Sequence, residues 1–205
     1  WTDMRYLHDR GIRAVAGFAE PGDWLTYELQ HYLFARISEH VFCDIGEVVA
    51  DYCQARFGPA GSQMISFFWL LEKISLTSQK LGFDAKFPSP EALRHGESLV
   101  ADATRLLRSA LTTRGLKRER KEHVTRLQSG LRTITFSFEL MQAETREDLE
   151  RGIRKYLRWV HRHSERGLFV EAFALTADRL RTLLGRELVD KKERERIYRD
   201  LLETL

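Results

Sequence analysis

The sequence predicts a mainly α-helical protein, folded as an antiparallel bundle of seven or eight helices. Only 4 of its 205 residues are Pro and 13 are Gly, too few for a protein made of tightly turned strands. Beyond residue 23, apolar side chains recur every three or four positions, which is the period of one helix face. Short segments with helix-ending and helix-starting residues separate these periodic runs, as in helical bundles.

The first 22 residues carry a different pattern from the rest. Residues 3–10 predict a short helix, and the alternating apolar run from Ile12 to Phe18 predicts a strand. One strand cannot satisfy its own backbone hydrogen bonds, so it must pair with strands outside this chain. We therefore expect residues 1–22 to be a remnant of a (β/α)8 barrel, and residues 23–205 to form the helical domain. The first residue is Trp1 and not methionine, which fits a piece of a longer polypeptide.

Start and stop signals divide the rest of the chain into helices. Candidate N-caps stand at Asp23, Asp44, Ser89 and Thr145, the last as a capping box with Asp148. Residues 62–81 are apolar on nearly every face, and they predict a central, buried helix whose three consecutive aromatic residues belong to the core. The predicted helices cover residues 24–37, 45–56, 62–81, 90–112, 117–142, 146–164, about 168–184 and about 190–204.

Composition and spacing exclude several classes of function. With 43% hydrophobic residues and no apolar run near the about 20 residues of a membrane span, the chain is globular and no membrane partner is expected. Cys43 and Cys53 are too far apart along the chain for a disulfide across one helix, so we expect free thiols. His161 and His163 point to opposite sides of a helix. They cannot share a metal ion, so no metal site is expected. The sequence has no Gly-rich phosphate loop, so no cofactor is expected either.

Four arginines of the helix over residues 146–164 form a one-sided basic row, which we call the arginine row. Its members are Arg151, Arg154, Arg158 and Arg162. Such a row suits an anionic partner, although a solvated helix face is the more common explanation. Acidic residues stand beside the row and no aromatic residue is expected in it for base stacking, so nucleic acid is not favoured as the partner.

Glu20 is the candidate binding residue at the end of the predicted strand. Active-site residues of (β/α)8 barrels lie at the C-terminal ends of the strands, which is where Glu20 stands. The N-terminus of the helix that begins after Asp23 would favour its ionised form, which suits hydrogen bonding to sugar hydroxyls better than proton donation. The alternative for Glu20 is a loop glutamate near a helix N-terminus. Trp24 lies close by in the sequence, where it either offers a face on which a sugar can stack or packs inward.

Several of these segments together resemble a known family, the glycoside-hydrolase-like proteins labelled domain of unknown function 4838. The resemblance covers residues 4–75 and is sharpest where an aromatic-Gly-Pro-Ala turn joins two helices. Gly61 departs from the second Ala of the family pattern, and residues 38–43 depart from its Trp-Asp/Asn-Pro turn. The segments are Gly11-Ile12 through Glu20, Glu28-Leu29 through Ile37, Asp44-Ile45 through Tyr52, Phe57-Gly58-Pro59-Ala60-Gly61 and Met64 through Glu72.

The resemblance implies that the chain is the accessory C-terminal helical domain of a carbohydrate-active enzyme. Its partners would be the N-terminal barrel portion of the parent chain and the carbohydrate bound there. Glycoside hydrolysis by the common route takes two carboxyl groups about 5–10 Å apart. Only Glu20 is a candidate here, so we expect no catalytic residue in this chain and no activity of the chain alone. The alternative is a free-standing helical module that binds an acidic partner through the arginine row.

Overall fold

The computed structural model describes residues 2–12, 24–79, 90–142 and 145–164. Of these residues, 86% are helical, which confirms the predicted helical class. The elements are α1 (Thr2–Asp9), α2 (Trp24–Glu39), α3 (Ile45–Phe57), the 3-10 turn η2 (Gly58–Ala60), α4 (Gly61–Gln79), α5 (Pro90–Leu111), α6 (Arg118–Met141) and α7 (Arg146–Ser164).

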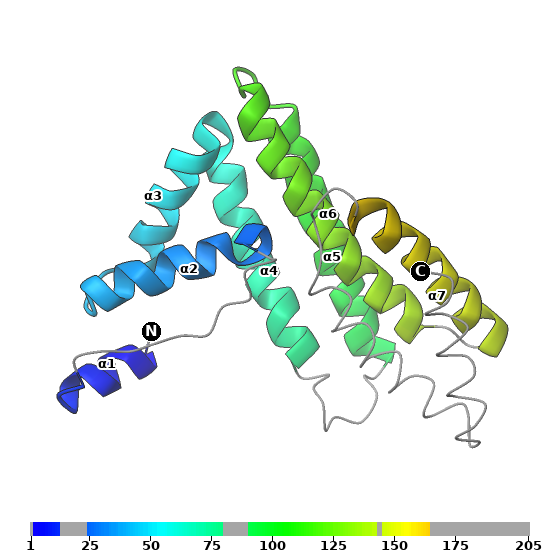
Figure 1. The fold of residues 1–205 in the computed structure, drawn as a ribbon, viewed down its shortest axis with the longest axis horizontal. Coiled ribbons are helices and arrows are strands. Elements are labelled where there is room, and N and C mark those ends of the chain that lie inside the picture. The colour runs from blue at the N-terminus through cyan, green and yellow to red at the C-terminus, as the bar shows by residue number, and fades with distance from the viewer. Residues whose placement is uncertain (1, 13–23, 80–89, 143–144, 165–205) are drawn as a thin grey trace.

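Consecutive helices from α2 to α7 pack against each other, with α4, α5 and α6 at the centre. Figure 1 shows α3 and α4 diverging from the η2 turn, and α5 and α6 running side by side in opposite directions. The helices α1 and α7 lie at opposite ends of the long axis. The α5–α6 pair is therefore flanked by α4 on one side and by α7 on the other.

Local capping sets the helix boundaries at the predicted residues. The Asp44 carboxylate accepts a hydrogen bond from the Glu47 amide at 3.0 Å, and this satisfies a free donor at the start of α3. The Thr145 hydroxyl oxygen accepts from the Asp148 amide at 3.1 Å, which confirms the cap of α7. Gly58 ends α3 with φ +55° and ψ −119°, a conformation that residues with a Cβ rarely adopt.

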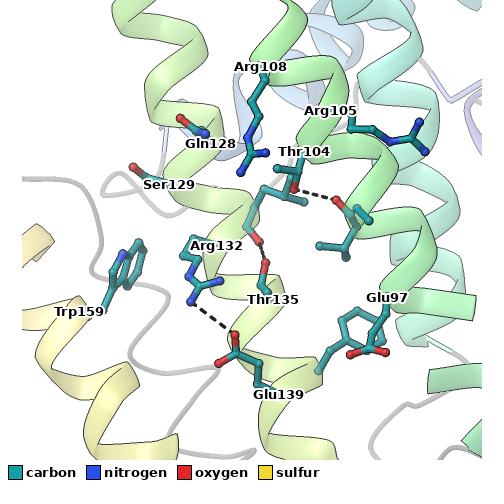
Figure 2. Close-up of a pocket in the computed structure, with 14 residues that line it drawn as sticks. Glu97, Thr104, Arg105, Arg108, Gln128, Ser129, Arg132, Thr135, Glu139 and Trp159 are labelled. Carbon is teal, nitrogen blue, oxygen red and sulfur yellow. Dashed lines mark hydrogen bonds and ion pairs between the residues drawn. The ribbon is translucent and has the colours of Figure 1, made fainter. Parts of the chain in front are cut away.

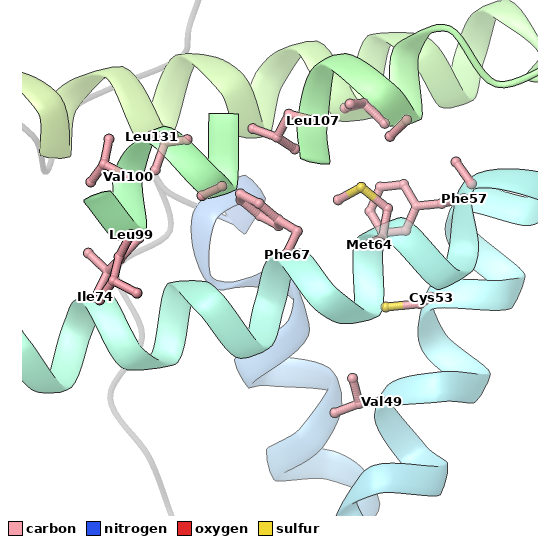
Figure 3. Close-up of a cluster of buried hydrophobic side chains, with 14 of the residues drawn as sticks. Val49, Cys53, Phe57, Met64, Phe67, Ile74, Leu99, Val100, Leu107 and Leu131 are labelled. Carbon is pink, nitrogen blue, oxygen red and sulfur yellow. The ribbon is translucent and has the colours of Figure 1, made fainter. Parts of the chain in front are cut away.

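The core lies between α3, α4, α5 and α6, and Figure 3 shows how their side chains meet. Phe67 of α4 is buried among residues of α5, as the apolar pattern predicted. The prediction that all three aromatic residues of α4 belong to the core is wrong for Trp69, which is 42% exposed. It lies on the face of α4 that its helix neighbours leave uncovered, whereas Phe68 is partly buried against the core.

Several expectations fall outside the described residues. These are the strand beyond Ile12, the N-caps Asp23 and Ser89, the helices predicted beyond residue 164, and Glu20. The helix predicted over residues 3–10 is confirmed as α1. Gly11, with φ +81°, ends this helix, and the Ile12 amide donates to the Leu7 carbonyl at 3.0 Å.

A glycine lets α5 and α6 approach each other closely. Gly96 is buried inside α5, and a Cβ added there would lie 2.3 Å from an edge carbon of the Phe138 ring of α6. No real Cβ makes so short a contact, so the aromatic ring rests on the bare backbone of Gly96. A glycine in a helix interior costs about 1 kcal/mol relative to alanine, which indicates that close packing explains its presence here.

We therefore expect Gly96→Ala to destabilise the protein although alanine is the better helix former. The added methyl group must push the Phe138 ring or separate the helices, at a net cost of about 1–2 kcal/mol. Chemical denaturation measures the free energy of unfolding. Ser98→Ala, at an exposed position of the same helix, is the control and should change it by less than about 0.5 kcal/mol. A Gly96→Ala variant as stable as the parent would contradict the close contact.

Candidate functional site

A groove of about 760 Å³ runs between α5 and α6 and is bordered by α7. Its volume falls in the range of about 300–1,000 Å³ that is usual for ligand sites. Two faces with the same helical spacing form its walls, because residues 97, 101, 104 and 108 of α5 run antiparallel to residues 128, 132, 135 and 139 of α6. Buried apolar side chains form its floor: Val100, Leu131 and Phe138.

The two ends of the groove differ in charge. Figure 2 shows Arg108 extending from α5 toward α6, with Gln128 at the same end of the groove. Glu97 of α5 and Glu139 of α6 lie at the other end. This arrangement follows from the antiparallel helices, which bring the last turns of α5 beside the first half of α6.

Ion pairs hold Glu139 in place. Its carboxylate lies 2.8 Å from Nζ of Lys155 on α7 and 3.4 Å from the Arg132 guanidinium. Both cations also lie over the ring of Phe136, at 5.5 Å and 4.5 Å from its centroid. The contact with Lys155 ties α7 to α6, and the two cations together hold the Glu139 carboxylate in place.

Trp159 of α7 forms an aromatic border of the groove, as Figure 2 shows. Its ring lies 5.7 Å from that of Phe136 and 6.3 Å from that of Tyr156. Tyr156 is buried, whereas Trp159 is only partly buried. The tryptophan therefore packs against other aromatic rings and also contributes to the lining of the groove.

Among the described residues, none of those that the sequence predicted as sites lines the groove. Glu20 lies outside the described residues, so its role stays a prediction. Trp24 begins α2, and its side chain is likewise outside the described part. The four members of the arginine row are exposed on α7 and are not among the residues that line the groove.

The arginine row is partly neutralised by its own helix. Arg151 contacts the Asp148 carboxylate, and Arg154 lies 3.1 Å from that of Glu150. Arg158 and Arg162 donate from Nε to backbone carbonyls one turn earlier, at 3.2 Å and 3.1 Å. Exposed pairs of this kind add little stability, but they reduce the charge that the row presents.

Sequence reasoning missed the groove and its tryptophan. Tyr156 and Trp159 alternate with the arginine row in the sequence, but Tyr156 is buried and Trp159 lies at the groove, which the four arginines do not line. A visible signal was the polar spacing of 4, 3 and 4 on α6, at Gln128, Arg132, Thr135 and Glu139. That spacing marks a helix face that is polar but not necessarily solvated.

A second polar cluster lies where α2, α3 and α6 meet. The Arg56 guanidinium of α3 contacts the Glu28 carboxylate of α2 at 2.9 Å, and both side chains are about one-third exposed. Both charges act on the pKa of His123 of α6: Arg56 lowers it and Glu28 raises it. The Nδ1 atom of His123 is buried without a hydrogen-bond partner among the described residues. Because these residues do not line the groove, we interpret the cluster as a junction between helices.

The environment of the junction shifts the pKa of its neighbours. Burial and then the nearby Glu28 carboxylate raise the pKa of the Tyr52 phenol, which therefore stays neutral. Burial raises the pKa of the Cys53 thiol to about 12, so this thiol is a poor nucleophile. Both cysteines are free thiols, as predicted.

No other chemistry is indicated by the described part of the chain. Within it, no group of three or more His, Cys, Asp or Glu side chains is placed to hold a metal ion. None of its helices is long and apolar enough to cross a membrane. Comparison with known proteins finds no matching family model, no matching curated protein and no matching solved structure.

The junction predicts a pH dependence of stability. Burial and then the Arg56 cation lower the pKa of His123 below its usual 6.5. The unfolded chain therefore binds a proton first, and stability falls as the pH drops below about 6.5 toward the folded-state pKa. Melting temperatures at about pH 7.5 and about pH 5.5 should differ more for the parent than for His123→Gln, which cannot titrate. If the melting temperature changes equally with pH in the parent and in His123→Gln, His123 is not the cause of the pH dependence.

Proposed function

We propose that the chain is the accessory helical domain of a carbohydrate-active enzyme, and that it binds a saccharide in the groove between α5, α6 and α7. The observation that carries the proposal is the combination of Trp159 with hydrogen-bonding side chains around one elongated space. The resemblance of residues 4–75 to glycoside-hydrolase-like proteins supports it from the sequence.

The groove has the two kinds of surface that a sugar needs. One face of a pyranose ring carries C–H groups, which stack on an indole ring, whereas its edge carries hydroxyl groups that donate and accept hydrogen bonds. Trp159 supplies the aromatic surface, and Gln128 and Glu97 supply donors and acceptors on facing helices. A groove of about 760 Å³ has room for a short oligosaccharide.

The charges favour binding over catalysis. A general acid in glycoside hydrolysis needs a carboxyl group whose pKa is raised so that it holds a proton. Glu139 contacts two cations, Lys155 and Arg132, and Glu97 is exposed to solvent. Neither carboxyl group lies in apolar surroundings as a general acid does, so we propose that any hydrolysis takes place in the rest of the parent protein.

The proposal also assigns roles to the two ends of the chain, including residues outside the described part. Residues 1–22 would belong to the barrel of the parent, with Glu20 and Trp24 contributing to its substrate cleft. Residues 165–205 would add the last helices and bring the bundle to seven or eight. The N-terminal barrel portion of the parent would then be the protein partner of the domain.

The alternative proposal is an interaction module that binds an acidic partner through the arginine row. All four arginines are exposed, which supports it. Intrahelical carboxylates contact Arg151 and Arg154, however, and this leaves less charge for a partner. The alternative requires that charge reversal at Arg158 and Arg162 abolishes binding of the acidic partner. The groove proposal requires that the same change leaves saccharide binding intact.

We expect the chain to bind oligosaccharides without cleaving them. Isothermal titration calorimetry with a set of tetrasaccharides should give dissociation constants between about 1 μM and about 1 mM, and no reducing ends should be released. Trp159→Phe keeps the packing against Phe136 but loses half of the stacking surface, so it should weaken binding about fivefold or more.

Trp69→Phe is the matched control because Trp69 is exposed on α4 and does not line the groove. It should leave the affinity unchanged. Equal effects of the two substitutions, or no binding by any saccharide, would overturn the proposed function. Release of reducing ends by the chain alone would show that it is catalytic.

A further inference from the structure

We propose that the Arg108 end of the groove is a subsite for the acidic group of an anionic saccharide, with Arg108 and Gln128 as its ligands. This inference rests on the proposed function and adds to it the class of sugar. A sugar carboxylate and a sugar sulfate share the chemistry that such a site recognises, a planar or trigonal face of anionic oxygens.

Arg108 differs from the other arginines of the groove because its guanidinium has no partner among the described residues. Three arginines line the groove, and Arg105 contacts the Asp102 carboxylate while Arg132 pairs with Glu139. No hydrogen bond or ion pair of the Arg108 guanidinium exists among the described residues. Its five N–H donors are therefore available to a ligand within the groove.

The residues opposite Arg108 fit an acidic ligand. Gln128 faces it from α6, and its side-chain amide likewise has no partner among the described residues. The Ser129 hydroxyl donates to the Thr125 carbonyl at 3.3 Å, so it is not free to donate to a ligand. A guanidinium and an amide on facing helices can hold both oxygens of one carboxylate.

The other end of the groove gives the ligand a direction. Glu97 and Glu139 lie there, and carboxylates accept hydrogen bonds from sugar hydroxyls but repel an acidic group. An anionic saccharide would therefore lie with its acidic group toward Arg108 and its neutral hydroxyls toward the glutamates. A neutral saccharide has no such preference for direction.

The test compares a neutral, a uronate and a sulfated tetrasaccharide of similar length by calorimetry. The acidic saccharides should bind about tenfold or more tightly than the neutral one, and the advantage should shrink as salt is added. Arg108→Gln, which keeps a polar side chain, should remove the advantage, so that the acidic saccharides bind no more tightly than the neutral one.

Arg114→Gln is the matched control, since Arg114 is exposed, lies between α5 and α6, and does not line the groove. It changes the net charge equally and should leave the advantage in place. If all three saccharides bind equally, or if the two substitutions act alike, the subsite is wrong but the proposed function stands. If none binds, both are wrong. The uronate and sulfate arms decide which acidic group is preferred.

Discussion

The contact of the Phe138 ring with the backbone of Gly96 is the interaction on which the described structure most depends. It lets α5 and α6 lie close together, and it fixes how the two helices are offset along their length. Phe138 belongs both to the core and to the lining of the groove, so the same contact joins stability to the candidate site. Widening the helix pair at Gly96 would change the floor of the groove as well as the core.

Antiparallel pairing also explains why the groove has ends of opposite charge. Arg108 stands in the last turn of α5, where a cation complements the dipole of the helix. The dipole accounts for an arginine at that position, but it does not require the side chain to extend toward α6 as it does. At the other end, Lys155 and Arg132 hold Glu139 and connect α7 to the pair. Three helices therefore border the groove. Ion pairs hold Glu139 at one end, whereas the Arg108 side chain at the other end has no partner among the described residues.

The helix boundaries were predictable because they depend on neighbours in the sequence. Asp44 caps α3 and Gly58 ends it as predicted, since a capping side chain and a glycine act within one turn. The groove was not predictable, because the sequence does not show how α5 and α6 are offset. That offset places Arg108 and Gln128 at the same end of the groove. The exposure of Trp69 and Trp159 was not predictable for a similar reason. Both occur in apolar patterns, and their exposure depends on which neighbouring helices cover them. The role of Glu20 depends on residues that the described part does not include.

The central claim is that the groove is where a ligand binds, and amide and indole chemical shifts in a titration with a uronate tetrasaccharide test it directly. A groove ligand must change the environment of residues from three separate helices at once. The account predicts that the largest shifts occur at Arg108, Gln128 and the indole N–H of Trp159, and that they saturate with a single dissociation constant. Shifts confined to Arg158 and Arg162 on the exposed face of α7, with those three residues unaffected, would contradict it.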